Sequence, residues 1–149
     1  MEKYNKSLDM EEFQAALKKH GLKVTPQRVA VHKAMMALVH ASADMVTERI
    51  LEEGNAKVTV ASVYNILSQM SLLGIYQHRL SANNKMYFDV VRTRHIHMYD
   101  TVNHTYVDIM DDMKLKELED KLLSRRFKGY KVDGLDIQIL AHPNVRGKK

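Results

Sequence analysis

The stretch that decides the fold runs from residue 59 to residue 90 and begins TVASVYNILSQMSLLGI. Its apolar residues recur at the spacing of one helix face, at Val63, Ile66, Leu67, Met70 and Leu73. Gly74 ends this predicted helix. Two short strand patterns follow, at 75–80 and 86–90, on either side of the polar turn 81–84. The stretch therefore predicts a helix followed by a β-hairpin.

Three further helices are expected upstream of this stretch. The first covers about 8–20, the second begins at Thr25-Pro26, and the third begins at Ser42 and ends at Gly54. Thr25 and Ser42 are N-cap residue types, and Pro26 fits the first position of a helix. Helices of this type before a hairpin are typical of a winged helix-turn-helix, in which the last helix enters the DNA major groove.

The second half of the chain has a different pattern. We expect strands at 97–100 and 105–109, a helix at 114–127 and an alternating strand at 132–140. A unit of about 55 residues buries little surface alone, which favours dimerisation through its sheet. The prediction is an α+β protein with a winged helix-turn-helix domain at 1–90, a hinge at 91–94 and a small α/β dimerisation domain at 95–149.

Composition excludes several classes of function. The chain has 149 residues and no cysteine, which rules out disulfides, thiolate metal sites and a cysteine nucleophile. No apolar run is long enough to span a bilayer, and the first residues lack the apolar segment of a signal peptide. We therefore expect a cytoplasmic protein without a membrane partner. The net charge of +5 is spread along the chain, so it permits nucleic-acid binding without proving it.

The sharpest local pattern is His95-Ile96-His97. Two histidines two residues apart on a strand point to the same face and can share a transition-metal ion. If the hairpin closes symmetrically about 101–104, His97 lies directly opposite Asp108, whose carboxylate then joins that face. The alternative is an exposed strand with ordinary surface histidines.

At this point the chain resembles a known family, the ferric uptake regulator (Fur) family. The resemblance covers about residues 8–140 and rests on motifs in both halves: GLKVTPQR at 21–28, HASAD at 40–44, ASVYNIL at 61–67, GI at 74–75, YFD at 87–89, HIH at 95–97 and VD at 107–108. The resemblance implies a metal-dependent transcriptional repressor. Its regulatory ligands would be His40, Asp89, His95, His97 and Asp108.

Three imidazoles and two carboxylates suit Fe(II), Mn(II) or Zn(II) without choosing among them. A metal ion held by all five would connect the winged helix with the second domain and select one orientation of the paired winged helices. An aspartate at 108 resembles the peroxide-responsive branch of the family, in which ferrous iron reacts with peroxide and oxidises a ligand histidine, His40 or His95 here. Control of metal homeostasis stays open beside control of peroxide-stress genes.

The chain departs from the family at its structural zinc site, which is usually held by cysteines. With no cysteine, that site cannot exist in its usual form, and we expect one divalent metal per subunit. Asp100, His104 and His142 could form a substitute site. The alternative is that Asp100 is a turn former and His104 is simply exposed. His20, His32 and His78 are interpreted as surface or partly buried histidines.

The predicted DNA-contacting residues lie mainly on the last helix of the winged domain. They are Ser62, Tyr64, Asn65 and Gln69 on that helix, with Arg28 and Lys85 as phosphate contacts. Asn65 stands where the family usually has arginine, and because asparagine reads adenine, the operator would differ from the family's usual one. The alternative is a solvated helix face. A homodimer predicts a palindromic double-stranded operator.

Two other functions stay open from the sequence. A site of histidines and carboxylates can host the chemistry of a non-haem iron enzyme, although no substrate pocket is visible in the pattern. The chain could also be a DNA-binding regulator with a vestigial or haem-responsive site. We favour a regulator over an enzyme.

Overall fold

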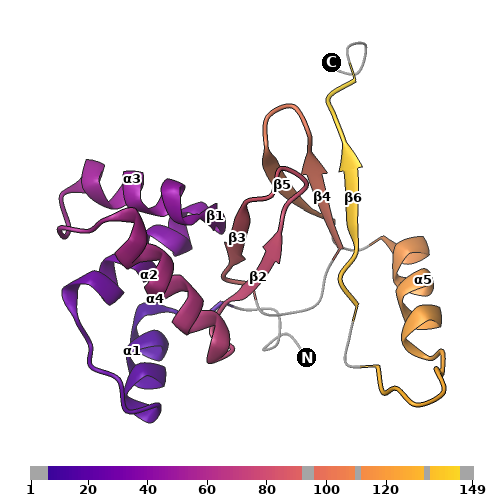
Figure 1. Ribbon diagram of the computed structural model, residues 1–149, viewed down its shortest axis with the longest axis horizontal. Coiled ribbons are helices and arrows are strands. Elements are labelled where there is room, and N and C mark those ends of the chain that lie inside the picture. The colour runs from indigo at the N-terminus through magenta and orange to yellow at the C-terminus, as the bar shows by residue number, and fades with distance from the viewer. Residues whose placement is uncertain (1–6, 92–95, 110–111, 133–134, 145–149) are drawn as a thin grey trace. The chain divides into compact units, whose positions relative to one another are not determined.

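The structure is a computed structural model that describes residues 7–91, 96–109, 112–132 and 135–144 (Figure 1). The chain divides into two compact units, residues 1–93 and 94–149. Residues 92–94 of the predicted hinge 91–94 lie outside the described residues. The predicted dimerisation role of the second domain stays a prediction.

The described residues of the N-terminal unit form four helices and three strands. They are α1 (Met10–Lys19), α2 (Pro26–Leu38), β1 (His40–Ser42), α3 (Ala43–Glu53), α4 (Val60–Leu72), β2 (Gln77–Leu80) and β3 (Met86–Asp89). The strands form an antiparallel sheet in the order β1-β3-β2. This arrangement of helices beside a β-hairpin agrees with the predicted winged helix-turn-helix (Figure 1).

Each helix of this unit begins at a side chain that caps its free backbone amides. Thr25 accepts a hydrogen bond from the backbone N–H of Arg28, and Ser42 accepts one from that of Met45. Both helix starts were predicted from these residue types. The first helix begins two residues later than predicted, because Asp9 forms a reciprocal capping box with Glu12.

The core of the N-terminal unit joins all four helices to the hairpin. Side chains with no exposed surface include Phe13 and Leu17 of α1, Val31 and Met35 of α2, Val46 and Ile50 of α3, and Val63, Leu67 and Met70 of α4. Phe88 of β3 packs in the same cluster. The predicted apolar face of residues 59–73 is therefore the buried face of α4, and exposed residues such as Ala61 and Asn65 lie on its other side.

The strand β1 was not predicted from the sequence. It has only three residues and follows Val39, whose φ of 67° and ψ of −56° reverse the chain at the end of α2. Because a β-branched residue rarely adopts a positive φ, the sequence contains no pattern that predicts this chain reversal. The backbone N–H of Val90 donates to the carbonyl of Val39, which joins the reversal to the end of β3.

The C-terminal unit contains β4 (Ile96–Asp100), β5 (Thr105–Ile109), α5 (Met113–Leu123) and β6 (Gln138–Ala141). Its sheet has the order β5-β4-β6, with β5 antiparallel and β6 parallel to β4. The helix ends four residues before the predicted Phe127, and the last strand is shorter than the predicted 132–140. In both cases the apolar pattern of the sequence is longer than the run of residues that forms the helix or the strand.

No side chain of α5 is buried within the described residues of the C-terminal unit. Leu118 of α5, Val107 of β5 and Leu140 of β6 are each about half exposed. Among the described residues, no helix is both long and apolar enough to cross a membrane.

Candidate metal centre and DNA-binding face

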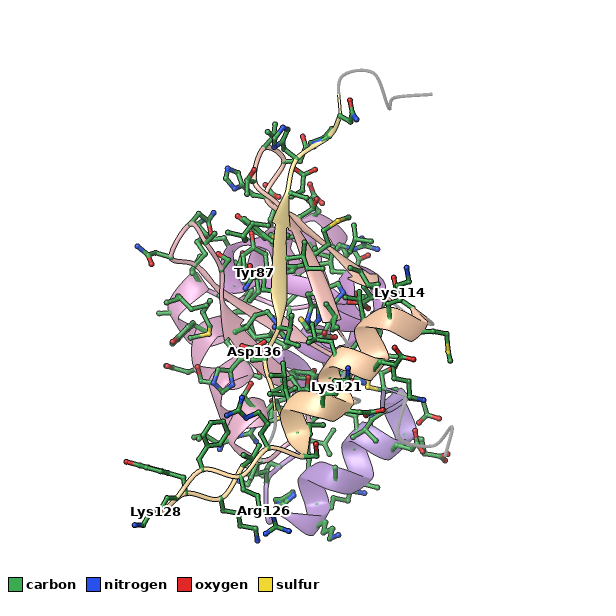
Figure 2. All side chains as sticks on the ribbon, turned by 90° about the vertical axis from the view of Figure 1, so that its right-hand side faces the viewer. Tyr87, Lys114, Lys121, Arg126, Lys128 and Asp136 are labelled. Carbon is green, nitrogen blue, oxygen red and sulfur yellow. The ribbon has the colours of Figure 1, made fainter. Side chains whose placement is uncertain are left out.

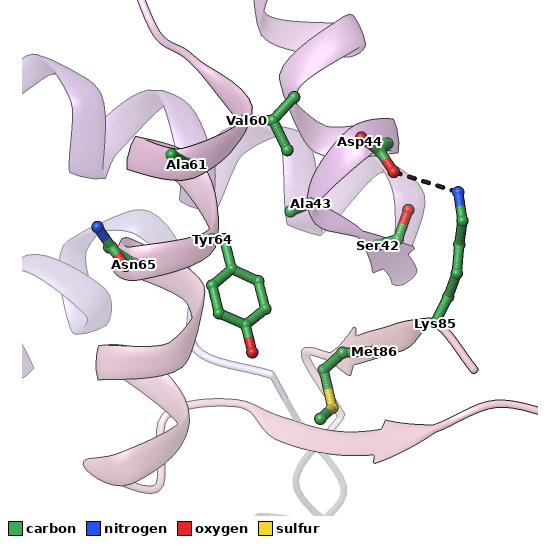
Figure 3. A pocket seen from close by; sticks show the side chains of 9 residues that line it. All are labelled: Ser42, Ala43, Asp44, Val60, Ala61, Tyr64, Asn65, Lys85 and Met86. Atoms are coloured by element: carbon green, nitrogen blue, oxygen red, sulfur yellow. Dashed lines mark hydrogen bonds and ion pairs between the residues drawn. The ribbon is translucent and has the colours of Figure 1, made fainter.

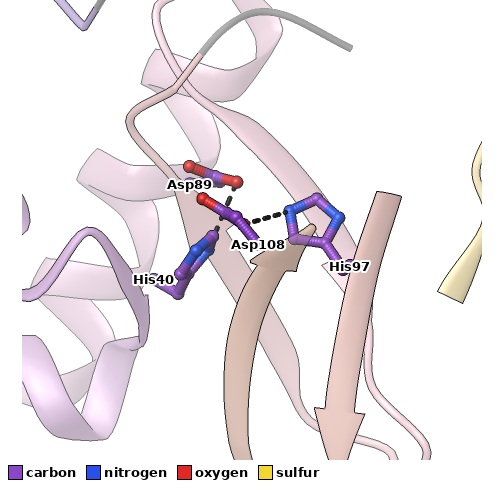
Figure 4. A group of neighbouring side chains, drawn as sticks. All are labelled: His40, Asp89, His97 and Asp108. Carbon is purple, nitrogen blue, oxygen red and sulfur yellow. Dashed lines mark ion pairs between the residues drawn. The ribbon is translucent and has the colours of Figure 1, made fainter. Parts of the chain in front are cut away.

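The first half of the candidate metal centre is a histidine–aspartate pair across two strands of the N-terminal unit. The register of β1 and β3 sets His40 directly opposite Asp89, and Nδ1 of His40 lies 3.2 Å from Oδ2 of Asp89. Asp89 is 3% exposed. Its other oxygen, Oδ1, accepts a hydrogen bond of 2.8 Å from the backbone N–H of Val91. Strand pairing and this hydrogen bond together orient the carboxylate toward the imidazole (Figure 4).

The second half is built in the same way in the C-terminal unit. The register of β4 and β5 sets His97 opposite Asp108, as the symmetric closure of the hairpin predicted. Nε2 of His97 lies 3.4 Å from Oδ1 of Asp108 (Figure 4). His97 has no exposed surface, and the ring of Tyr106 meets it edge-on at 5.7 Å. The imidazole is therefore fixed on both sides.

The spacing of the donor atoms in each pair fits a transition-metal ion. Metal–ligand bonds of about 2.1 Å place neighbouring ligand atoms about 3.0 Å apart at a right angle and about 3.4 Å apart in a tetrahedron. The two nitrogen–oxygen distances, 3.2 and 3.4 Å, fall in this range. Imidazole nitrogen with carboxylate oxygen suits iron, manganese or zinc. Each pair could thus supply two adjacent ligands with little rearrangement.

His95, the fifth predicted ligand, lies outside the described residues. It directly precedes β4, whose first described residue is Ile96. The predicted role of His95 therefore stays a prediction.

The residues proposed for a substitute site behave differently from the two pairs. The carboxylate of Asp100 accepts hydrogen bonds from the backbone N–H groups of Val102 and Asn103 and from the side chain of Asn103. The hydrogen bonds from Asn103 lower the pKa of Asp100. His104 hydrogen-bonds through Nδ1 to the hydroxyl of Tyr99 at 2.7 Å. These contacts favour the interpretation of Asp100 as a turn former.

The predicted DNA-binding face is the exposed side of α4 with the adjacent hairpin. Asn65 is exposed, and Tyr64 is 43% exposed with its ring edge-on to Phe88 at 6.1 Å. A hollow of about 430 Å³ lies beside Tyr64 and Asn65, and Figure 3 shows the Tyr64 ring extending toward Met86 of β3. Tyr64 thus has both a packing role and an accessible edge.

The other predicted DNA contacts have partners within the unit. The guanidinium of Arg28 donates to Oε1 of Gln69 at 3.2 Å and to the carbonyl of Lys23 at 2.7 Å. Lys85 donates to Asp44 at 3.1 Å across an exposed pair (Figure 3). Exposed pairs of this kind contribute little stability, so Lys85 can exchange its partner for a phosphate. Ser62 belongs to the cap of α4, where its hydroxyl accepts from the backbone N–H of Thr59.

The comparisons with known proteins agree on one family. The family model described as "Ferric uptake regulator family" matches residues 19–139. The chain belongs to the ferric uptake regulator family. A ferric uptake regulation protein from Neisseria meningitidis serogroup A is 30% identical over 127 residues, which cover 83% of this chain and 86% of the relative.

Two solved structures share the fold. The ferric uptake regulator from Pseudomonas aeruginosa, solved with manganese, has a TM-score of 0.68 and 21% identity, and covers 88% of this chain and 97% of its own. The peroxide stress regulator of Campylobacter jejuni has a TM-score of 0.64 and 28% identity, and covers 89% of this chain and 97% of its own.

Membership of the Fur family decides between the function classes. This Fur-family chain is a metal-responsive transcriptional regulator with an N-terminal DNA-binding domain, and it is not an enzyme. The enzyme alternative is therefore set aside.

His32 of this Fur-family chain lies deeper in the fold than its sequence position predicted. His32 was predicted to be at the surface or partly buried, but it has no exposed surface. Its ring stacks on Phe13 at 4.1 Å and lies parallel to Tyr76. Nε2 of His32 donates to the carbonyl of Leu8 at 2.7 Å, and Nδ1 accepts from the Tyr76 hydroxyl at 2.8 Å. The position of His32 on the inner face of α2 was the feature of the sequence that could have predicted its burial.

Proposed function

We propose that this Fur-family protein is a homodimeric repressor whose affinity for its operator is set by one divalent transition-metal ion per subunit. The ligands would be His40, Asp89, His95, His97 and Asp108. The observation that carries the proposal is the repeated cross-strand pair: each unit opposes a histidine and an aspartate whose donor atoms have the spacing of adjacent metal ligands. A metal ion with ligands from both units would select one orientation of the winged helix.

The ligand set supports Fe(II) or Mn(II) as the functional ion, with Zn(II) as a possible occupant. The P. aeruginosa relative was solved with manganese, and the C. jejuni relative is a peroxide stress regulator. Together with the aspartate at 108, these relatives favour a role in metal homeostasis or in the peroxide-stress response. Bound iron would supply the reaction with peroxide, while the chain's own residues hold the ion and place the histidines beside it.

Dimerisation is supported by the surface of the C-terminal unit. The sheet ends in the edge strands β5 and β6, and exposed apolar side chains lie on β5, β6 and α5. Exposed edges and apolar surface of this kind are usually covered by a partner. A two-fold dimer would present two α4 helices to a palindromic operator, with Tyr64, Asn65 and Gln69 near the bases. Such a regulator would act in the cytoplasm, where its DNA lies.

The test is a titration of operator DNA with the full chain, in chelator and with Mn(II), Fe(II) or Zn(II). We expect metal to raise operator affinity at least tenfold, and Asp108→Asn to remove most of this gain. Asp100→Asn is the matched control, because its carboxylate belongs to the turn of the same unit. Loss of binding after hydrogen peroxide only in the iron form would support peroxide sensing. Equal affinity with and without chelator would overturn metal gating.

A further inference from the structure

The loop that follows α5 in the C-terminal unit combines positive charge with exposed aromatic rings. Residues 124–132, which we call the basic loop, read SRRFKGYKV and contain four cationic side chains and no acidic one. Every residue from Ser124 to Lys131 is exposed. Figure 2 shows Arg126 and Lys128 projecting from this loop. The proposed metal centre and the DNA-binding face use none of these residues.

A tight turn organises the two aromatic residues of the loop. The backbone N–H of Tyr130 donates to the carbonyl of Phe127 at 3.0 Å, and the two residues form an isolated antiparallel bridge. Gly129 has a φ of +86°, which suits the third position of a type II turn. Residues directly opposite each other in an antiparallel pair project to the same face. The turn therefore presents both rings on one side.

The rings remain accessible although they have neighbours. Phe127 is 49% exposed and Tyr130 is 83% exposed. The guanidinium of Arg125 lies 5.4 Å from the centre of the Phe127 ring, a cation–π contact that holds the ring in place. A hollow of about 610 Å³ opens beside the loop, lined by these rings and by the cationic side chains.

We propose that the basic loop binds single-stranded nucleic acid. Cationic side chains suit the phosphates, and exposed aromatic rings stack on unpaired bases, a combination found in proteins that bind single strands without sequence preference. The rings cannot stack on the bases within a duplex, because those bases are already stacked on one another. Self-association through the loop is disfavoured, because a two-fold axis would bring the same cations of two copies face to face.

The experiment uses the full chain in chelator and a fluorescein-labelled oligo(dT) dodecamer, with binding followed by anisotropy. We expect Phe127→Ala/Tyr130→Ala to weaken binding at least about tenfold, since stacking on each base contributes substantially. Lys128→Ala/Lys131→Ala should lower the slope of log affinity against log salt by about 1.4, which corresponds to two phosphate contacts. The matched control is Lys114→Ala/Lys116→Ala, which removes two exposed cations of α5 and should leave oligo(dT) binding unchanged.

A second measurement separates this proposal from the proposed repressor function. Metal-dependent affinity for the operator duplex should be the same in the Phe127→Ala/Tyr130→Ala variant and the original chain. The proposal is overturned if the original chain does not bind oligo(dT), or if this variant binds it as tightly. It is also overturned if the chain binds vesicles containing phosphatidylserine and not oligo(dT), or if the variant changes from dimer to monomer.

Discussion

At the scale of single residues, Asp89 is a buried carboxylate of the proposed metal centre. It is almost fully buried, and its two oxygens have different neighbours. Oδ1 accepts from the backbone N–H of Val91, whereas Oδ2 faces Nδ1 of His40. Burying a carboxylate is costly unless hydrogen bonds or cations compensate it. A metal ion at Oδ2 would provide that compensation.

The first prediction separates the two roles of this carboxylate. Asp89→Asn keeps an oxygen for the Val91 N–H but loses the negative charge toward His40. Mutating a residue that only hydrogen-bonds to a metal ligand commonly lowers metal affinity by about 10- to 100-fold. Removing the charge of a ligand itself should therefore weaken Mn(II) binding at least about tenfold. Isothermal titration of Mn(II) measures this, with Asp44→Asn, an exposed aspartate of the same unit, as control. Equal affinities of the Asp89→Asn variant and the original chain would remove Asp89 from the site.

His32 is the other residue whose burial has a measurable consequence. Burial lowers its pKa below the ordinary value, against smaller opposing effects of the Leu8 carbonyl and the Asp9 charge. Burial also raises the pKa of Tyr76, so that its hydroxyl keeps the proton that it donates to His32. The neutral imidazole is therefore the form that the folded chain stabilises.

The second prediction is a loss of stability in mild acid. Above about pH 6.5, the ordinary pKa of histidine, the ring is neutral in both states. As the pH falls below this value, His32 becomes protonated in the unfolded chain but stays neutral in the folded chain, whose His32 pKa is lower. The free energy of unfolding therefore falls by at most about 1.4 kcal/mol per pH unit. Urea unfolding of the original chain and of His32→Gln, compared between pH 7.5 and 5.5, isolates this contribution. Parallel pH dependences in the two proteins would contradict it.

At the scale of elements, α4 depends on how it begins. The Thr59 hydroxyl accepts from the backbone N–H of Ser62, and the Ser62 hydroxyl accepts from the backbone N–H of Thr59. This reciprocal cap satisfies amides at the helix start that have no partner within the helix. Ser62 therefore serves α4 first, and any contact with DNA competes with its capping role.

The third prediction tests this cap. Thr59→Ala should lower the free energy of unfolding by about 1 kcal/mol, because it removes the capping oxygen. Thr59→Asn is the matched control, since asparagine is an equally good N-cap and should leave stability nearly unchanged. Chemical denaturation of the metal-free chain measures both. Equal destabilisation by alanine and asparagine would show that the cap does not stabilise α4.

At the scale of the whole molecule, the chain divides into two units, and each contains one histidine–aspartate pair of the proposed ligand set. The N-terminal unit contributes His40 and Asp89, and the C-terminal unit contributes His97 and Asp108. An ion held by both halves would make the stability of each unit depend on ligands of the other. A ligand that binds only the folded state, at 100 times its dissociation constant, stabilises it by about 2.7 kcal/mol.

The fourth prediction uses this dependence. Hydrogen exchange of the full chain should show that Mn(II) protects amides of β1 and β3 and also amides of β4 and β5. In the His40→Ala variant, protection should be lost in both units, because the bridging ion is lost. The reciprocal variant His97→Ala should behave in the same way. Loss of protection confined to the unit that carries the substitution would contradict a shared ion.

Much of the fold follows from local patterns in the sequence. The starts of α2 and α3 were predicted from Thr25 and Ser42, because capping depends on residue type and on nearby amides. The opposition of His97 and Asp108 was predicted from the length of their turn, because a hairpin's register is set locally. The end of α5 was misplaced, because the same apolar spacing continues into the basic loop.

By itself, the sequence determined the α+β class, the winged helix-turn-helix and one histidine–aspartate pair. Only the tertiary structure placed His40 opposite Asp89 and buried His32 against the Phe13 ring with Tyr76 beside it. The physical reason is the range of the interactions. Caps and hairpin registers join residues a few positions apart, whereas β1 reaches β3 across more than forty residues of chain. Such a pairing is stabilised by packing of the whole unit and leaves no local signal.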